Sequence, residues 1–243
     1  MRLPDDVRTL VRTQDPTRPR LTWYGPESGD RVELSGKVLD NWAAKVGNLL
    51  QEELDLGPRG TVRLDLPAGH WRALYWALGA WSVGATVEVG AERPVSGADV
   101  LVTARPQGSL GVADASLQVV AVNLEPLARR AAWPLQPGDI DEARQLSSYG
   151  DVLDTWARPE PASPALRGPD GLWSFDTLIA PVDDHARLLL TTGGSPGVLL
   201  RGALSAWAAD GSVVITPRAA DAEPARLAAI EHAVVTDPDQ FRG

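Results

Sequence analysis

The run from Thr191 to Gly197 is the part of the sequence whose residue types most directly suggest chemistry. It reads Thr-Thr-Gly-Gly-Ser-Pro-Gly and so combines hydroxyl side chains with glycines. Glycines let backbone N–H groups approach a bound anion closely, and hydroxyls add further hydrogen bonds. We therefore predict a ligand-binding site in this run. Its candidate residues are Thr191, Thr192, Gly193, Gly194 and Ser195.

The same run fits the G-x-S-x-G pattern of a nucleophile elbow, with Ser195 as the nucleophile. An acid (Asp210 or Asp221) and then His232 follow in the chain order of α/β-hydrolases. Pro196 opposes this interpretation, because the oxyanion hole of an elbow uses the backbone N–H of the residue after the serine, and proline has none. A hydrolase using Ser195 therefore stays as an alternative, and we assign no catalytic residue.

Histidine and cysteine usage predicts no metal site. The three histidines, His70, His185 and His232, fall in different predicted elements and do not have the spacing of metal ligands. The chain has no cysteine, which excludes disulfides, a thiol nucleophile and cysteine-ligated metals. His70 follows Gly69 near a predicted helix start. We keep His70 as a candidate ligand-pocket residue, beside the simpler role of capping or packing.

The charge balance argues against a nucleic-acid partner. The 243 residues carry 23 basic and 32 acidic side chains, a formal net charge of −9, and the sequence pI is about 4.8. A phosphate backbone is repelled by such a protein on average. Only Lys37 and Lys45 are lysines, so the sequence also lacks the Gly-Lys step of a Walker A loop.

Nothing in the hydropathy pattern predicts a membrane segment or a signal peptide. Acidic residues stand at positions 5 and 6, where a signal peptide needs an apolar run. The longest uncharged stretch, from Ala73 to Val87, is shorter than the about 20 residues that a spanning helix needs. We expect a cytoplasmic protein whose partner is a small molecule or another protein.

Strands and helices alternate along the sequence, as expected where a parallel sheet is covered by helices. The apolar spacing predicts helices over 5–12, 36–50, 70–81, 139–146, 198–209 and 224–231. Predicted strands cover 21–24, 31–34, 61–66, 85–89, 100–102, 118–122, 187–192, 212–215 and 233–235. The predicted fold class is α/β, with two similar, mostly parallel lobes.

The composition changes between residues 133 and 170, where prolines are frequent. We interpret this segment as a connection between a first lobe (1–132) and a second, smaller lobe (171–243), although one compact domain is also compatible with the pattern.

The second lobe repeats the first at an offset of 126 positions. Residues 61–66 align with 187–192, and residues 86–89 with 212–215, without a gap between them. The sequence therefore predicts an internal structural repeat.

The chain has nine tryptophans. Four fall on apolar helix faces and are expected in the core: Trp42, Trp76, Trp81 and Trp207. The others are candidates to line a groove between the lobes: Trp23, Trp71, Trp133, Trp156 and Trp173.

Several segments, in order along the chain, resemble the AMP-binding (acyl-adenylate-forming, acyl-CoA synthetase-like) enzymes. Residues 15–35 resemble the opening of that family, and Gly57-Pro58-Arg59-Gly60-Thr61-Val62 is similar to its "PGDRV" turn. Residues 77–87 are similar to its "ALLAxxKAGAVVVP" segment, and residues 199–214 to "GLLxxLLAPLLAGGSVVL". The resemblance implies the fold of the family's N-terminal domain and ATP, AMP or an acyl group as ligand, whereas the residues alone predict no cofactor.

The departures from the family concern its catalytic parts. The family's phosphate loop, TSGTTGxPKG, has no counterpart in residues 150–180, where it is expected. The run 191–197 lacks the lysine and lies too close to the strand at 212–215, so the resemblance places this run beside the acyl pocket. The lysine of the family's C-terminal domain also has no counterpart, because no lysine follows Lys45.

These departures favour a homologue without adenylation activity. We expect it to bind a small ligand (an acyl group or a nucleotide) or to serve in protein interaction. The alternatives are an enzyme that is completed by a partner chain and the hydrolase using Ser195.

Overall fold

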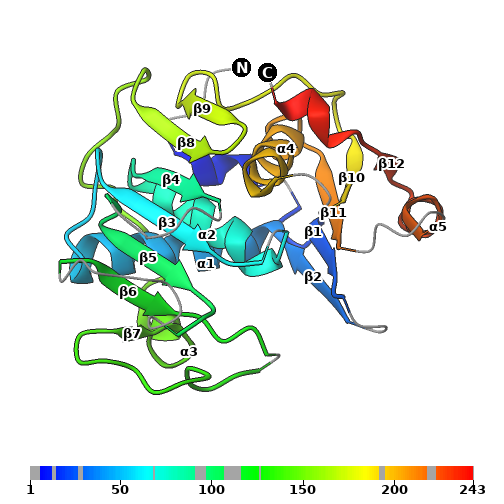
Figure 1. Ribbon diagram of the computed structural model, residues 1–243. Coiled ribbons are helices and arrows are strands. Elements are labelled where there is room, and N and C mark those ends of the chain that lie inside the picture. Colours follow the sequence, from blue (N-terminus) through cyan, green and yellow to red (C-terminus); the bar gives the residue numbers. More distant parts are fainter. Residues whose placement is uncertain are drawn as a thin grey trace.

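The structure is a computed structural model. It describes residues 6–12, 15–26, 30–67, 69–90, 97–106, 116–125, 127–191, 195–217 and 223–242. Figure 1 shows two twisted sheets with α2 and α4 between them. The predicted α/β class is confirmed.

The smaller sheet has five strands in the order β12-β10-β11-β1-β2. The strands β1 and β2 form an antiparallel hairpin, and the remaining pairs are parallel. Its strands are β1 (Pro19–Tyr24), β2 (Arg31–Ser35), β10 (Arg187–Thr191), β11 (Ser212–Thr216) and β12 (Val234–Val235).

The larger sheet has seven strands in the order β7-β6-β5-β3-β4-β8-β9, and only β8 and β9 are antiparallel. Its strands are β3 (Thr61–Asp65), β4 (Thr86–Val89), β5 (Val100–Thr103), β6 (Gln118–Ala121), β7 (Ile140–Asp141), β8 (Pro164–Gly168) and β9 (Gly171–Ser174).

The helices are α1 (Gly36–Asn48), α2 (Trp71–Ser82), α3 (Glu142–Gln145), α4 (Pro196–Ala208) and α5 (Glu223–Glu231). Short 3₁₀ turns cover Val7–Leu10, Leu146–Ser148 and Pro238–Phe241, and α1 continues into a wider turn over Leu49–Glu53. In the part of the chain that the structure describes, no helix combines the length and apolarity needed to cross a membrane.

The helix α1 begins where the sequence predicts it. Ser35 is the N-cap, and its hydroxyl accepts a hydrogen bond of 3.3 Å from the N–H of Val38. Further along, α1 packs against α2 so closely that a Cβ at Gly79 would lie 2.4 Å from Cγ1 of Val46. The close approach of α1 and α2 therefore requires glycine at position 79.

Two local predictions need correction. The helix expected over 5–12 is only a 3₁₀ turn at Val7–Leu10 in the described residues. The segment 133–170 is more than a connection with one short helix, because it also contributes β7 and β8 to the seven-stranded sheet. The backbone of β4 pairs with β8 there, which satisfies hydrogen bonds at a strand that would otherwise be an edge.

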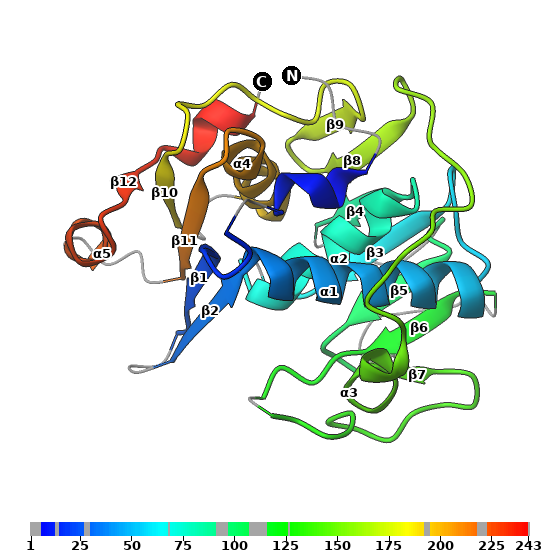
Figure 2. The same cartoon turned by 180° about the vertical axis from the view of Figure 1, so that it is seen from behind.

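Strand pairing crosses the lobe boundaries that the sequence suggests. The N-terminal β1 lies beside β11 in parallel, with Leu21 opposite Val213. Figure 2 shows the β1–β2 hairpin continuing the sheet that β10 and β11 form. The division into lobes at 132 and 171 stays a prediction.

Candidate ligand-binding site

The predicted run 191–195 lies between β10 and α4. Thr191 is the last residue of β10, and Ser195 is the N-cap of α4. Thr192, Gly193 and Gly194 lie outside the described residues. The hydroxyl oxygen of Ser195 is buried and has no hydrogen-bond partner among the residues that the structure describes.

The crevice beside Ser195 has almost no free volume. Apolar side chains from the two sides fill it, and the remaining cavity measures about 10 Å³. Its lining includes Leu66, Leu74, Pro196, Leu199 and Leu200. Ligand pockets usually measure about 300–1,000 Å³, so this crevice has no room for a ligand in the described arrangement.

The residues of the hydrolase alternative are not brought together. No described residue forms a hydrogen bond with Ser195 Oγ, and His232 is exposed just after α5. Asp210 instead forms an ion pair with Arg20 at 2.8 Å, and its carboxylate lies 3.2 Å from Nδ1 of His185. Asp221, the other candidate acid, lies outside the described residues. Among the described candidates, Ser195, Asp210 and His232 form no Ser–His–Asp arrangement.

His70 has the capping and packing role. Its Nδ1 accepts a hydrogen bond of 3.2 Å from the N–H of Arg72, which caps α2. The ring centroid lies 4.9 Å from that of Trp23 and 5.8 Å from that of Trp71. Burial, and secondarily the charge of Arg72, lower the pKa of His70 to about 4, so the ring is neutral at pH 7.

An open cavity adjoins Trp23 and Trp71, the two neighbours of His70. This cavity has a volume of about 520 Å³ and is lined by residues of the β1–β2 hairpin, of α1, of the start of α2 and of α3, together with Leu124, Leu127 and Ala128. We call it the tryptophan cavity. Its apolar lining includes Trp23, Val32, Trp42, Trp71, Leu124, Leu127 and Leu146, and its polar lining is Asp30, Arg31, Arg72, Glu142 and Ser147.

Glu142 joins α3 to α2 at the wall of the cavity. Its carboxylate is almost fully buried and accepts hydrogen bonds from Tyr75 Oη at 2.5 Å, Trp76 Nε1 at 2.9 Å and Arg72 Nη1 at 3.2 Å. Burial, and then the negative charge of Glu142, raise the pKa of Tyr75 well above its usual value. The phenol therefore stays protonated and remains a donor.

Arg72 is the cation of this wall. Its Cζ lies 4.6 Å from the ring centroid of Trp71, and Nη1 also donates to Tyr75 Oη at 2.9 Å. Burial alone lowers the pKa of Arg72, but Tyr75 and Glu142 outweigh it and the net shift is upward. The guanidinium therefore stays charged.

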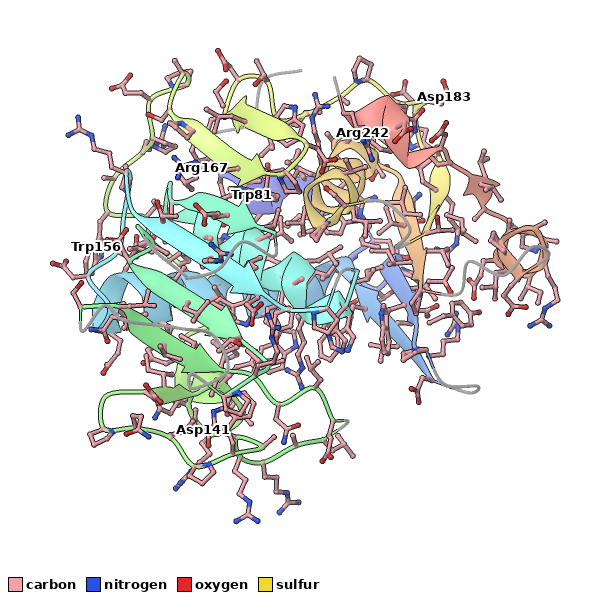
Figure 3. The ribbon with its side chains drawn as sticks, viewed as in Figure 1. Trp81, Asp141, Trp156, Arg167, Asp183 and Arg242 are labelled. Carbon is pink, nitrogen blue, oxygen red and sulfur yellow. The ribbon has the colours of Figure 1, made fainter. Side chains whose placement is uncertain are left out.

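The tryptophans divide differently from the prediction. Trp42 was expected in the core but lines the tryptophan cavity, where its ring stacks at 5.6 Å on Tyr75. Of those expected in a groove, Trp23 and Trp71 line the cavity, Trp173 is buried, and Trp156 is 63% exposed and points outward (Figure 3). The apolar spacing of a helix predicts which face points inward, but it does not show whether that face packs against another element or lines a cavity.

Sequence reasoning missed Arg72 and Glu142. The spacing of Arg72, Tyr75 and Trp76 at i, i+3 and i+4 places them on one helix face, which is a weak signal for a shared partner. Glu142 lies 66 positions from Trp76, and only the tertiary fold brings it there. Among the residues that the structure describes, no group of three or more acidic, histidine or cysteine side chains is arranged to hold a metal.

The arrangement of two mostly parallel sheets around central helices is the fold of acyl-CoA synthetase N-terminal regions. A Brucella canis acyl-CoA synthetase superposes with a TM-score of 0.71, over 95% of this chain and 46% of that one, at 16% identity. A Mycobacterium tuberculosis fatty acyl CoA synthetase gives 0.66, over 94% and 48%, at 16% identity. The resemblance that the sequence indicates is thereby confirmed at the level of the fold.

A third structure with this fold carries a ligand. The Klebsiella oxytoca NpsA N-terminal subdomain, in complex with 3-hydroxybenzoyl-AMSN, superposes with a TM-score of 0.67 over 97% of this chain and 59% of that one, at 12% identity.

A relative is also found by sequence. The TIGR03089 family protein of Mycobacterium tuberculosis (strain ATCC 25618 / H37Rv) is 36% identical over 150 residues, which are 60% of this chain and 60% of that protein. The chain thus spans about 60% of the length of this curated relative and less than half of the two synthetases. No protein-family model matches the sequence.

Proposed function

We propose that this protein binds a small molecule in the tryptophan cavity and does not adenylate carboxylic acids. The proposal rests on the difference in volume between two cavities. The tryptophan cavity holds about 520 Å³, whereas the crevice beside Ser195, which the resemblance places at the acyl pocket, holds about 10 Å³. A ligand-binding role of Thr191, Thr192, Gly193, Gly194 and Ser195 stays a prediction.

The segment in which the resemblance places a phosphate loop supports the absence of adenylation. It contains the β8–β9 hairpin, where Gly168 pairs with Gly171 and leaves only Pro169 and Asp170 in the turn. A phosphate loop needs several free backbone N–H groups, and proline offers none. Asp170 adds a negative charge whose counterion is Arg242 at 3.6 Å, and this charge opposes phosphate binding.

The ligand class of the proposal includes acyl groups and nucleotides. The Klebsiella subdomain binds 3-hydroxybenzoyl-AMSN on the same fold. We infer a cytoplasmic location from the sequence features alone.

We also propose that the predicted internal repeat is a structural one. At the offset of 126, the elements of β3-α2-β4 and of β10-α4-β11 start and end within one residue of each other. Their paired strands share one register, with Thr61 opposite Thr86 and Arg187 opposite Ser212. Each helix is also followed by a left-handed residue at the same offset, Gly84 and Asp210. These correspondences support the repeat.

Two assays of the purified chain test the proposed function. ATP–pyrophosphate exchange over a panel of carboxylic acids is expected to stay at the background of a no-enzyme control. Saturable binding of small aromatic or acyl probes by calorimetry is expected, and Trp42→Leu is expected to weaken it. Pyrophosphate exchange well above background would contradict the absence of adenylation. Probe binding that Trp42→Leu leaves unchanged would contradict binding in the tryptophan cavity.

A further inference from the structure

We propose that the tryptophan cavity is a site for a planar organic anion, whose carboxylate pairs with Arg72 and whose apolar body lies against the tryptophan rings. This inference rests on the proposed function, because it names the chemistry of the ligand in the same cavity. Of the run 191–195, the structure describes Thr191 and Ser195, and neither of them lines this cavity.

The first argument is the unused edge of the Arg72 guanidinium. Nη1 donates to Tyr75 and Glu142, whereas Nε is buried without a hydrogen-bond partner. Within the described part of the chain, Nη2 also makes no hydrogen bond. Nε and Nη2 form one edge of the planar group, and two N–H groups on such an edge match the two oxygens of a carboxylate.

Of these two donors only Nε is buried, and leaving it without an acceptor is unfavourable. A buried donor without an acceptor loses its hydration without compensation, and a charged donor loses more than a neutral one. Stacking on Trp71 occupies one face of the Arg72 guanidinium, so a carboxylate meets the group in its plane, at Nη2 first because Nε is buried.

The second argument is the charge around the cavity. Glu142 already accepts three hydrogen bonds, so it has little capacity to bind a cationic ligand. Arg31 is paired with Glu33 and Glu231, whereas Asp30 adds a negative charge at the same wall that opposes an anion. A cation entering the cavity meets the charge of Arg72, whereas an anion completes that residue's hydrogen bonding.

The third argument is the shape of the apolar wall. Trp23, Trp42 and Trp71 offer ring surfaces, and the volume of about 520 Å³ lies within the range of pockets for drug-sized ligands. Aromatic side chains pack favourably against other flat rings in offset or tilted arrangements. A two-ring carboxylate is therefore a suitable probe.

Calorimetry with two matched probes tests the inference. The probes are 2-naphthoate, which is ionised at pH 7.5, and 2-acetonaphthone, in which a methyl group replaces the charged oxygen. We expect the wild-type protein to bind 2-naphthoate about tenfold or more tightly than 2-acetonaphthone, as hydrogen bonds to a charged group imply.

Two variants test whether Arg72 causes the preference for 2-naphthoate over 2-acetonaphthone. Arg72→Gln is expected to abolish it, and Arg226→Gln, which removes an exposed arginine of α5, is expected to leave it unchanged. If Arg72→Gln fails to fold, the two probes are compared on the wild-type protein and on the Trp42→Leu variant. This comparison still tests whether the tryptophan cavity prefers the anionic probe.

Equal affinities for the two probes on the wild-type protein, or a preference that survives in a folded Arg72→Gln variant, would overturn the inference while leaving small-molecule binding intact. Binding of neither probe to the folded wild-type protein would overturn the inference. Failure of the proposed function itself would show as no binding across the whole probe panel, or as pyrophosphate exchange.

Discussion

Tyr75 donates a hydrogen bond of 2.5 Å to Glu142, although the two residues lie 67 positions apart and both are buried. This contact joins α3 to α2, and residues that follow α3 (Leu146 and Ser147) line the tryptophan cavity together with Trp71 of α2. The cavity is therefore held open by a polar network at its wall.

Removing the charge of Glu142 is expected to be strongly destabilising. Glu142→Gln leaves the buried Arg72 without its counterion, and breaking a buried pair from one side costs about 3–5 kcal/mol. Urea unfolding measures this free energy. Glu160→Gln, at an exposed position, is the control and is expected to change stability by less than about 0.5 kcal/mol. Equal effects of the two substitutions would show that Glu142 has no structural role.

His70 predicts a pH dependence of stability. Its pKa is about 4 in the folded protein and about 6.5 in an unfolded chain, so the unfolded state binds more protons between these values. Stability is therefore fully present above about pH 6.5, falls as the pH drops from 6.5 towards 4, and loses about 3 kcal/mol from this residue in total.

His70→Asn separates this effect from other titrations. Asparagine keeps a side-chain acceptor for the N–H of Arg72 and does not titrate, so the variant is expected to lack this part of the slope. Urea unfolding at pH 7.5, 6.5, 5.5 and 4.5 gives both curves. Parallel curves for the wild type and the variant would mean that His70 does not titrate as described.

The contact between α1 and α2 predicts a specific cost at Gly79. Gly79→Ala gains helix propensity of about 1 kcal/mol but forces its methyl group against Val46, and overpacking of this kind costs about 1–3 kcal/mol. Gly57→Ala is the matched control, because nothing lies within 4 Å of its added Cβ. Thermal unfolding is expected to show a lower Tm only for Gly79→Ala, and an increase there would contradict the close approach of the helices.

The fold could largely be predicted because its signals are local. Ser35 caps α1 through an atom three residues away, and the strand that starts at Thr61 and the one that starts at Arg187 each precede a helix at the expected distance. The site could not be predicted in the same way. Trp42 has the spacing of a core residue, and only the position of α3 makes it part of a cavity wall.

The long-range pairings explain the remaining errors. Nothing near β8 in the sequence indicates β4 as its neighbour, and the prolines of 133–170 predict a connection instead. Likewise the pairing of Glu142 with Tyr75 depends on a segment that crosses the edge of the seven-stranded sheet.

The most direct test of the account is a crystal structure of the protein soaked with 2-naphthoate. The account predicts that the naphthalene ring lies in the tryptophan cavity beside Trp42 and Trp71, with the carboxylate within hydrogen-bond distance of Nε and Nη2 of Arg72. A naphthoate bound instead in the crevice between Leu74 and Leu199, beside Ser195, would contradict it.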